Sequence, residues 1–215
     1  AIIAMLVDHF APIFFPQSLP LQIIGRLSFI LIAWLIANGA YHTGHFDKYL
    51  GRLLIFAVLA QIPYEMGYYL AGHHPLFLNI LFTLFLGLLA IRGLRLQTSV
   101  YVKIAGVLAS MVLAGVLNAD YGAGGVLSIV AFYVFFNRPG LLVASQIFIH
   151  AILSNLGFFL LPGFGQEFVM HPMQAWAILA LPIILLYNKS RGYATGLFFY
   201  WFFVVQNFAV LLLKM

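Results

Sequence analysis

Apolar stretches follow one another along the whole chain, separated by short connections that contain Pro, Gly and charged residues. Breaking the sequence at these connections predicts nine helices, of which the first and the sixth are short. They cover residues 1–15, 21–40, 49–65, 76–92, 100–117, 122–136, 139–161, 173–188 and 193–213. Because the chain opens on apolar sequence without Met, we expect a missing initiator or a truncated first helix.

The composition indicates that these helices cross a membrane. Hydrophobic residues make up 64% of the 215 positions and charged residues only 7%. A soluble core does not absorb so much apolar surface, whereas a helix needs about 20 mostly apolar residues to cross about 30 Å of hydrocarbon. Long apolar runs, rather than short alternating segments, favour helices over a barrel. The sequence therefore predicts an all-α, polytopic transmembrane bundle that forms one integral membrane domain over residues 1–215.

Basic residues mark one side of the predicted bundle. Eight of the ten Lys and Arg residues lie in alternate connections or next to them: Lys48, Arg52, Arg92, Arg95, Lys103, Arg138, Lys189 and Arg191. The other connections, at 16–20, 66–75, 118–121 and 162–172, contain none. By the positive-inside rule the basic side faces the cytoplasm, so the N-terminus is cytoplasmic and the C-terminus lies outside.

Other polar residues gather on the opposite side. The same map places these residues at outer helix ends: Arg26, Glu65, His73, His74, Asp120, Glu167 and His171. Asp8 and His9 fall about two turns below the outer end of the first helix. An ionisable group in lipid costs roughly 2.5–3.5 kcal/mol on insertion scales, so it needs specific partners. We therefore expect a polar pocket that opens outward.

Asp8 and His9 are the first candidates for chemistry. Neighbouring residues on a helix point about 100° apart, so each needs its own partners on other helices. Pro12 has no backbone N–H, which deprives the Asp8 carbonyl of its helical donor and predicts a kink. Histidine titrates near neutral pH and is suited to taking a proton from an attacking amine or hydroxyl. The alternative is a hydrogen-bonded histidine that only stabilises helix contacts.

Arg26 and Glu65 offer further charge. Gly25 permits close helix approach, so the Arg26 guanidinium either pairs with Asp8 or holds an anionic group. Glu65 follows Pro63, which is expected to end the third helix, and is either an acid at the rim of the pocket or a partner of Arg26.

Three more residues have both a structural and a functional interpretation. Asn79 and Thr83 stand about one helical turn apart and either share a hydrogen-bond site or hold two helices together. Asp120 precedes the sixth helix, where an acidic residue is first of all a cap for unpaired N–H groups.

Several kinds of site are not expected. Cysteine is absent, which excludes disulfides, a thiol nucleophile and a cysteine-ligated metal. The pairs His42 with His45 and His73 with His74 lack the flanking ligands of a zinc site, so we expect no metal. The scattered basic residues form no stripe for nucleic acid. His150, His171 and Glu167 receive no assignment.

Several strings, taken in order and spacing, carry a family resemblance. They are Asp8-His9, the segment 24–29, His42-Thr43-Gly44, the segments 48–56, 61–64 and 78–84, Asp120-Tyr121-Gly122, Gly125-Val126-Leu127 and Phe132-Tyr133. Together they resemble the TraX family, membrane proteins associated with N-terminal acetylation of F-type pilin. The resemblance covers most of the chain and is strongest from 8 to 133. This family is related to transmembrane acyltransferases that use cytosolic acyl-coenzyme A.

The resemblance implies acetyl-CoA as donor, a bacterial inner membrane, and His9 as base or acyl relay. It makes Asp8 a supporting catalytic residue and implies substrate-binding roles for Arg26, Glu65, Asn79, Thr83, Asp120 and Gln206. Candidates for the phosphates of coenzyme A are Lys48, Arg52, Arg92, Arg95 and Lys103, which otherwise serve only as topology signals. Family members tend to carry Tyr-Pro-x-His in the last helix, whereas this chain reads Phe203-Val204-Val205-Gln206.

We therefore expect a membrane acyltransferase that acts on an amine or hydroxyl of a pilin-like peptide, a glycan or a lipid. Two alternatives stay open. One is a small transporter or lipid-handling protein with a path through Asp8, His9 and Arg26. The other is a non-catalytic factor in pilus or secretion-system assembly.

Overall fold

The computed structural model describes residues 1–15, 17–70, 77–155, 172–188 and 197–214. The elements are α1 (Ile2–Phe14), α2 (Leu19–His42), α3 (Phe46–Leu70), α4 (Ile80–Leu94), α5 (Val100–Val116), α6 (Gly122–Val134), α7 (Pro139–Ile147), the π-helix η1 (Phe148–Leu153), the 3-10 helix η2 (Pro172–Ala180), α10 (Leu181–Leu185) and α11 (Phe198–Lys214). The predicted all-α class is confirmed: within the described residues the only extended pairing is an isolated bridge between Leu78 and Ala119.

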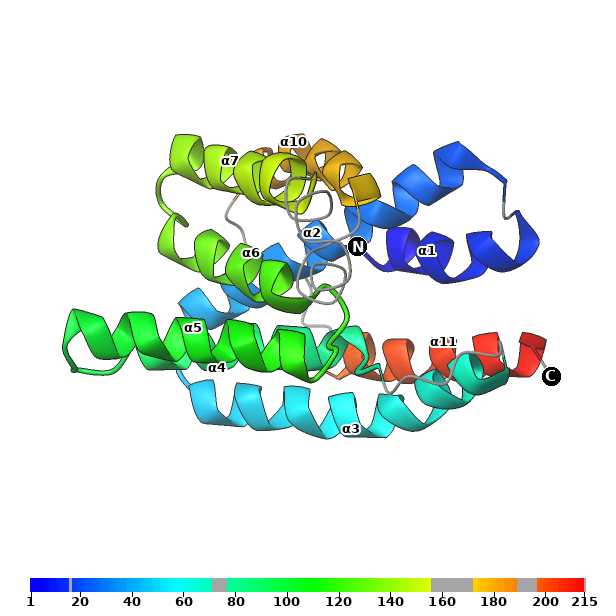
Figure 1. Cartoon of the computed structure of the whole chain (residues 1–215), viewed down its shortest axis with the longest axis horizontal. Helices are drawn as coiled ribbons and strands as arrows, with labels where there is room; N and C mark the ends of the chain where they lie inside the picture. The colour runs from blue at the N-terminus through cyan, green and yellow to red at the C-terminus, as the bar shows by residue number, and fades with distance from the viewer. Residues whose placement is uncertain (16, 71–76, 156–171, 189–196, 215) are drawn as a thin grey trace.

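The core lies where α2, α4 and α6 meet. In Figure 1, α3, α4, α5 and α11 form the lower part of the bundle, and α1, α2, α6, α7 and α10 form the upper part. Phe29 and Ile32 of α2, Leu84 of α4, and Ile129 and Phe132 of α6 are almost completely buried. Apolar contacts along these three helices therefore hold the two parts together.

A glycine permits the close contact between α4 and α6. A Cβ atom at Gly87 would lie 2.6 Å from Cδ1 and 3.0 Å from Cβ of Ile129. Non-bonded carbon atoms do not approach so closely, so the α4 backbone reaches Ile129 only because position 87 has no side chain. Gly125 has the same role on α6, where a Cβ atom would lie 2.7 Å from Cγ2 of Thr83.

Backbone hydrogen bonds fix the turn between α5 and α6. Leu78 N–H donates to the Asn118 carbonyl at 3.0 Å, and Asp120 N–H donates to the Leu78 carbonyl at 2.9 Å. In this turn Asn118 and Tyr121 adopt positive φ angles of 49° and 65°, a region that side-chain-bearing residues rarely occupy. The segment that leads into α4 thus holds the α5–α6 turn in one defined shape.

Two boundaries of the third and fourth helices differ from the sequence prediction by four residues or more. The prediction that Pro63 ends the third helix was wrong, because α3 continues to Leu70. Proline removes one helical hydrogen bond, but peptide groups among apolar side chains have no better partners than the rest of the helix. The fourth helix begins at Ile80 rather than at 76, because Asn79 caps it with its own side chain.

The seventh and eighth predicted helices are not uniform α-helices. The seventh changes from α7 to the π-helix η1 at Phe148, and its predicted residues 156–161 lie outside the described part of the chain. The eighth begins as the 3-10 helix η2 and becomes α10 at Leu181. Such departures from α-geometry are rare over this length.

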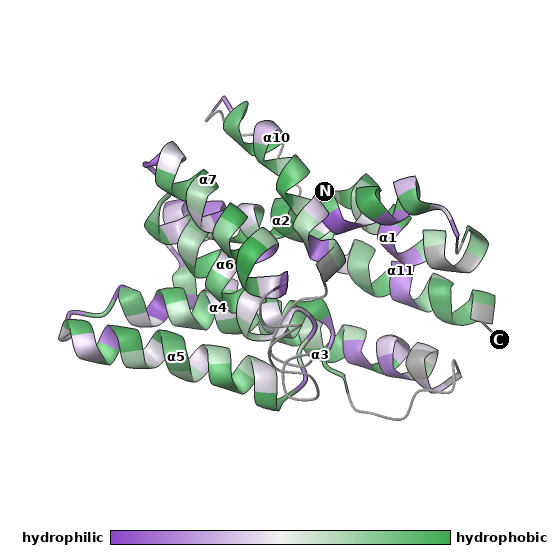
Figure 2. Cartoon of the chain, turned by 45° about the horizontal axis from the view of Figure 1, so that its top comes forward, coloured by the Kyte–Doolittle hydropathy of each residue, from purple (hydrophilic) through white to green (hydrophobic). Residues whose placement is uncertain are grey.

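The surface is apolar over several helices. By length and composition, α2 with 24 residues is the one described helix able to cross a membrane, and the other apolar helices have 10–17 residues. Yet large apolar side chains are exposed along α5, where Ile104, Leu108 and Val112 repeat every four residues. In Figure 2 most of the ribbon of each helix has the colour of hydrophobic residues. The number of helices that cross the membrane stays a prediction.

Substitution of Gly87 by Ala should destabilise the protein, because the added methyl group collides with Ile129. Overpacking of this kind typically costs about 1–3 kcal/mol. Gly51→Ala on α3 is the matched control, because nothing lies within 4 Å of its Cβ position. Thermal unfolding of purified protein in lipid nanodiscs should show a lower melting temperature for the Gly87 variant only. Equal melting temperatures for the two variants would contradict this packing.

Candidate functional site

An ion pair between α1 and α2 forms the first part of the site. Arg26 Nη2 lies 3.2 Å from Asp8 Oδ1, and the two side chains are 31% and 17% exposed. A Cβ atom at position 25 would lie only 2.6 Å from Asp8 Oδ1 and 2.9 Å from Asp8 Cα. Gly25 therefore permits the close approach that brings the guanidinium to the carboxylate, and of the two roles considered for Arg26 the ion pair with Asp8 is present.

His9 belongs to a second contact, between α1 and α11. Its Nδ1 lies 2.9 Å from Gln206 Nε2. The ring of Phe203, one turn before Gln206, meets the imidazole edge-on with 6.0 Å between ring centroids. Gln206 itself is buried. Asp8 and His9 thus find separate partners on separate helices, as their positions on α1 require.

Asp120 adds a second carboxyl group close to the ion pair. The hydroxyl of Thr83 donates to its backbone carbonyl. Asp120 is exposed by its accessible surface, although many protein atoms surround its carboxyl group. This burial and the negative charge of Asp8 raise the pKa of Asp120 from 3.8 to about 7, while Arg26 and the N–H of Tyr121 act in the opposite direction. Asp8, Arg26 and Asp120 therefore influence one another, and we call them the charged cluster.

The N-cap of α6 is Tyr121 and not Asp120, so the capping interpretation of Asp120 was wrong. Tyr121 adopts the left-handed conformation, and its ring stacks on Phe29 of α2 with 4.0 Å between centroids. This stack joins the α5–α6 turn to α2 one turn beyond Arg26.

Asn79 and Thr83 serve different neighbours, so of the two interpretations the structure supports the one in which they hold parts of the bundle together. Asn79 Nδ2 donates to the Ala57 carbonyl at 2.8 Å and to Gln61 Oε1 at 2.9 Å. Because Asn79 also caps α4, it ties α4 to α3. Thr83 instead reaches Asp120 on the α5–α6 turn.

Comparison with known proteins agrees with the resemblance. The family described as TraX protein matches residues 1–214. The chain belongs to the TraX family. It is also similar to a probable fimbrial assembly protein, FimC of serogroup H1 from Dichelobacter nodosus, with 34% identity over 138 residues. That alignment covers 57% of this chain and 54% of the relative, so the chain spans about half the length of this relative. No solved structure matches the chain.

A buried polar group in this TraX protein was missed by sequence reasoning. His150 is fully buried on η1 and lies within hydrogen-bond distance of Ser128 on α6, which also binds Gln146 on α7. The one signal in the sequence is the spacing of Gln146, His150 and Ser154, four residues apart. Gln174 of η2 was also missed, and its Nε2 lies 3.3 Å from the backbone carbonyl of Arg26.

The basic residues predicted to bind phosphates lie toward the other end of the bundle. Arg92 Nε is 2.8 Å from Asp47 Oδ1. The Arg95 guanidinium lies 4.8 Å from the centre of the Phe46 ring, and its Nε donates to the Tyr133 hydroxyl at 3.1 Å. Both arginines thus join the ends of helices α3, α4 and α6.

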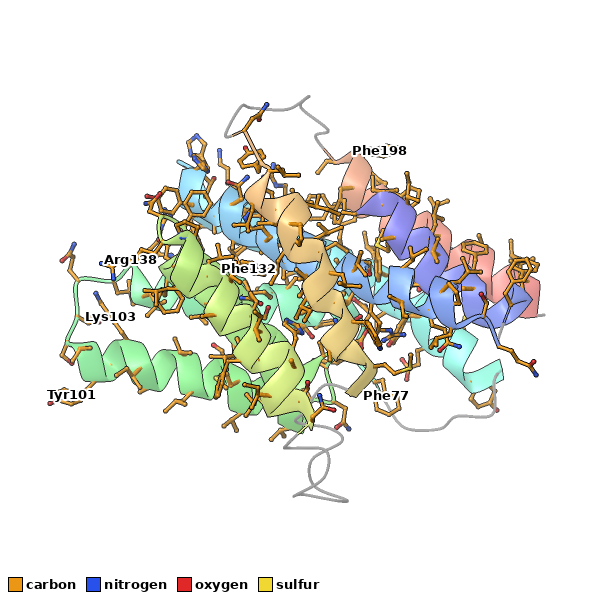
Figure 3. The ribbon with its side chains drawn as sticks, turned by 90° about the horizontal axis from the view of Figure 1, so that it is seen from above. Phe77, Tyr101, Lys103, Phe132, Arg138 and Phe198 are labelled. Carbon is orange, nitrogen blue, oxygen red and sulfur yellow. The ribbon has the colours of Figure 1, made fainter. Side chains whose placement is uncertain are left out.

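The remaining basic candidates are more open. Lys48 and Arg52 are exposed on α3, and Lys103 is partly exposed on α5. Figure 3 shows Lys103 and Arg138 at the same end of the molecule. On α2, Arg26 belongs to the charged cluster, and Tyr41 lies at the end of the helix nearest the basic residues. The two are 15 residues apart, so about 22 Å along the helix axis separates the charged cluster from the basic end.

Other predicted residues stay outside the site. Glu65 is partly buried on α3 and forms no ion pair with any described residue. His73, His74, Glu167, His171, Lys189 and Arg191 lie outside the described residues. Within the described ranges no group of three His, Asp or Glu side chains is arranged to hold a metal ion.

The raised pKa of Asp120 gives a pH dependence with a definite sign. Between about pH 4 and pH 7 the folded protein holds a proton on Asp120 that the unfolded chain has lost, so stability falls as pH rises through this window. We expect the melting temperature to decline from pH 5 to pH 8 more steeply in wild type than in Asp120→Asn. Asp47→Asn, in an exposed ion pair, should keep the wild-type slope. Equal slopes for wild type and Asp120→Asn would contradict the assignment.

Proposed function

We propose that this protein is a membrane acyltransferase that moves an acetyl group from acetyl-CoA to an amine or hydroxyl. The observation that carries the proposal is the junction of α1, α2 and α11, where His9 contacts Gln206 directly after Asp8, which pairs with Arg26. Ionisable groups among apolar helices are costly and mark functional sites by default. Membership of the TraX family supports the same chemistry.

His9 acts as the general base. It takes the proton of the acceptor as the acceptor nitrogen or oxygen attacks the acetyl carbonyl carbon. The C–S bond then breaks, and the imidazolium returns the proton to the departing thiolate. Gln206 pairs with His9 in either amide orientation. When the Oε1 of Gln206 accepts a hydrogen bond from His9 Nδ1–H, the lone pair of the imidazole lies at His9 Nε2. The general base needs this lone pair to take the proton.

The charged cluster supports the reaction electrostatically. Arg26, which pairs with the residue next to His9, stabilises the oxyanion that forms on the acetyl group. Asp8 holds the guanidinium in place. Asp120, with a pKa of about 7, exchanges a proton near neutral pH beside this pair. Helices that exclude water protect the thioester from hydrolysis.

The arrangement in the membrane follows the basic residues. We place the basic end of the bundle in the cytoplasm of a bacterial cell, with the charged cluster toward the outer side of the inner membrane. Lys48, Arg52 and Lys103 then face the phosphates of acetyl-CoA, whereas Arg92 and Arg95 already hold helix ends together. The exposed apolar faces of α5 and its neighbours contact lipid.

The acceptor belongs to pilus or fimbrial assembly in this proposal. The similarity to a probable fimbrial assembly protein supports a pilin-like peptide whose N-terminal amine receives the acetyl group, ahead of a glycan or a lipid. The same similarity also favours the second candidate function, a non-catalytic assembly factor. The purified protein transfers acetyl groups if it is the acetyltransferase and does not if it is a non-catalytic assembly factor.

Replacement of His9 by Ala should lower acetyl transfer by about 10²–10⁴-fold, the range typical of a lost general base. Transfer of radiolabelled acetyl from acetyl-CoA to a pilin-like peptide measures this in nanodiscs. His45→Ala, in the exposed loop between α2 and α3, should retain wild-type activity. A folded His9→Ala protein with undiminished transfer would reject His9 as the base.

The absence of cysteine makes the membrane orientation directly measurable. A single Cys at Gln97, in the α4–α5 connection, should react with a membrane-impermeant maleimide only after the inner membrane is opened. A single Cys at Gln17, between α1 and α2, should react in intact spheroplasts. Both positions are exposed. The reverse pattern of labelling, or labelling of both from one side, would overturn the orientation.

A further inference from the structure

His150 is a buried polar group that the proposed reaction does not use. It is 0% exposed and lies on the π-helix η1. Its Nε2 is 3.2 Å from Ser128 Oγ, whereas its Nδ1 has no hydrogen-bond partner in the described part of the chain. π-turns within α-helices are rare and occur frequently at functional sites. Helix geometry and the unpaired ring nitrogen therefore point independently to the same residue.

The hydrogen bonds around Ser128 decide which ring nitrogen of His150 carries the hydrogen. Gln146 Nε2 donates to the Ser128 backbone carbonyl at 3.2 Å, which turns the amide oxygen of Gln146 toward Ser128 Oγ. Ser128 uses its one hydroxyl hydrogen to donate to that oxygen at 2.7 Å. Oγ can then only accept from His150 Nε2–H. Nδ1 is therefore a buried acceptor, and an unpaired buried acceptor is unfavourable unless a ligand supplies a donor.

His150 lies between the two ends of the molecule. Leu142, two turns earlier on the same helix, lines a cavity of about 210 Å³ together with Trp34 and Tyr187. On the other side, the ring of Phe29 lies 5.9 Å from His150, and Arg26 is one turn before Phe29 on α2. His150 thus lies between a cavity near the basic end and the charged cluster, along both α7 and α2.

The surroundings of His150 restrict the chemistry of the ligand. Its neighbours are the neutral side chains of Ser128, Gln146 and Phe29, and no described residue forms an ion pair there. A phosphate or an ammonium group would lose its hydration without gaining a counter-charge. An uncharged N–H donor fits, and a secondary amide is the form in which such donors occur in acyl carriers.

We propose that His150 Nδ1 accepts a hydrogen bond from an amide N–H of the pantetheine arm of acetyl-CoA. The proposal rests on the proposed function, because it presumes that donor. The phosphates then stay at the basic end, the uncharged arm runs past His150 beside Ser128 of α6 and Phe29 of α2, and the thioester reaches His9 and Arg26. His150 is a donor-binding residue in this arrangement and takes no proton.

Two substitutions of His150 test its two ring nitrogens separately. His150→Gln keeps a polar group near Nε2 for Ser128 but removes the acceptor at Nδ1, whereas His150→Asn keeps an acceptor near Nδ1. Binding of acetyl-CoA is compared with binding of two analogues, each with one pantetheine amide N–H replaced by an ester oxygen. Wild type should bind one analogue about tenfold more weakly than acetyl-CoA, the effect of one lost buried hydrogen bond.

His150→Asn should keep this discrimination, and His150→Gln should bind acetyl-CoA and both analogues with equal, reduced affinity. Ser154→Ala, a buried polar substitution one turn further along, should behave as wild type. Wild-type binding of acetyl-CoA without discrimination, or unchanged discrimination in His150→Gln, would overturn the role of His150 and leave the proposed function intact. Failure of wild type to bind acetyl-CoA at all would overturn the proposed function as well.

Discussion

An arginine side chain among apolar helices needs a carboxylate at close range, and this requirement determines how α1 meets α2. The contact exists because Gly25 presents no side chain to Asp8. Removing one partner of such a shielded pair leaves the other charge uncompensated, which is far more costly than losing an exposed pair. The same pair positions the neighbouring His9 toward α11 and perturbs Asp120 on the α5–α6 turn. The contact at Gly25 therefore lies at the centre of a junction of α1, α2, α11 and the α5–α6 turn.

Much of the fold and part of the site could be predicted from local sequence. Apolar runs located the helices, and Gly25 next to Arg26 indicated a partner on the first helix. Helix continuation through Pro63 could not be predicted, because it depends on apolar surroundings that offer the peptide groups no alternative. The place of Asp120 depends on backbone bonds to Leu78, 42 residues earlier, which no local pattern records. His150 was missed because its partner Ser128 belongs to another helix and its π-turn has no signature in composition.

The contact between His9 and Gln206 clarifies a departure from the family pattern. The resemblance implied a histidine in the last helix, where this chain has Gln206. The amide reaches His9 at 2.9 Å, so the link between the first and last helices survives the difference. Glutamine has no ionisable proton, which leaves His9 as the one titratable side chain of this contact. Any proton transfer across the junction of α1 and α11 therefore involves His9.

Helix α4 is attached at both ends to charged groups. At one end Arg92 is bound to Asp47, and at the other Leu78 and Thr83 hold the backbone of Asp120. One continuous helix of 15 residues thus fixes the separation between an exposed ion pair at the basic end and the turn that carries Asp120.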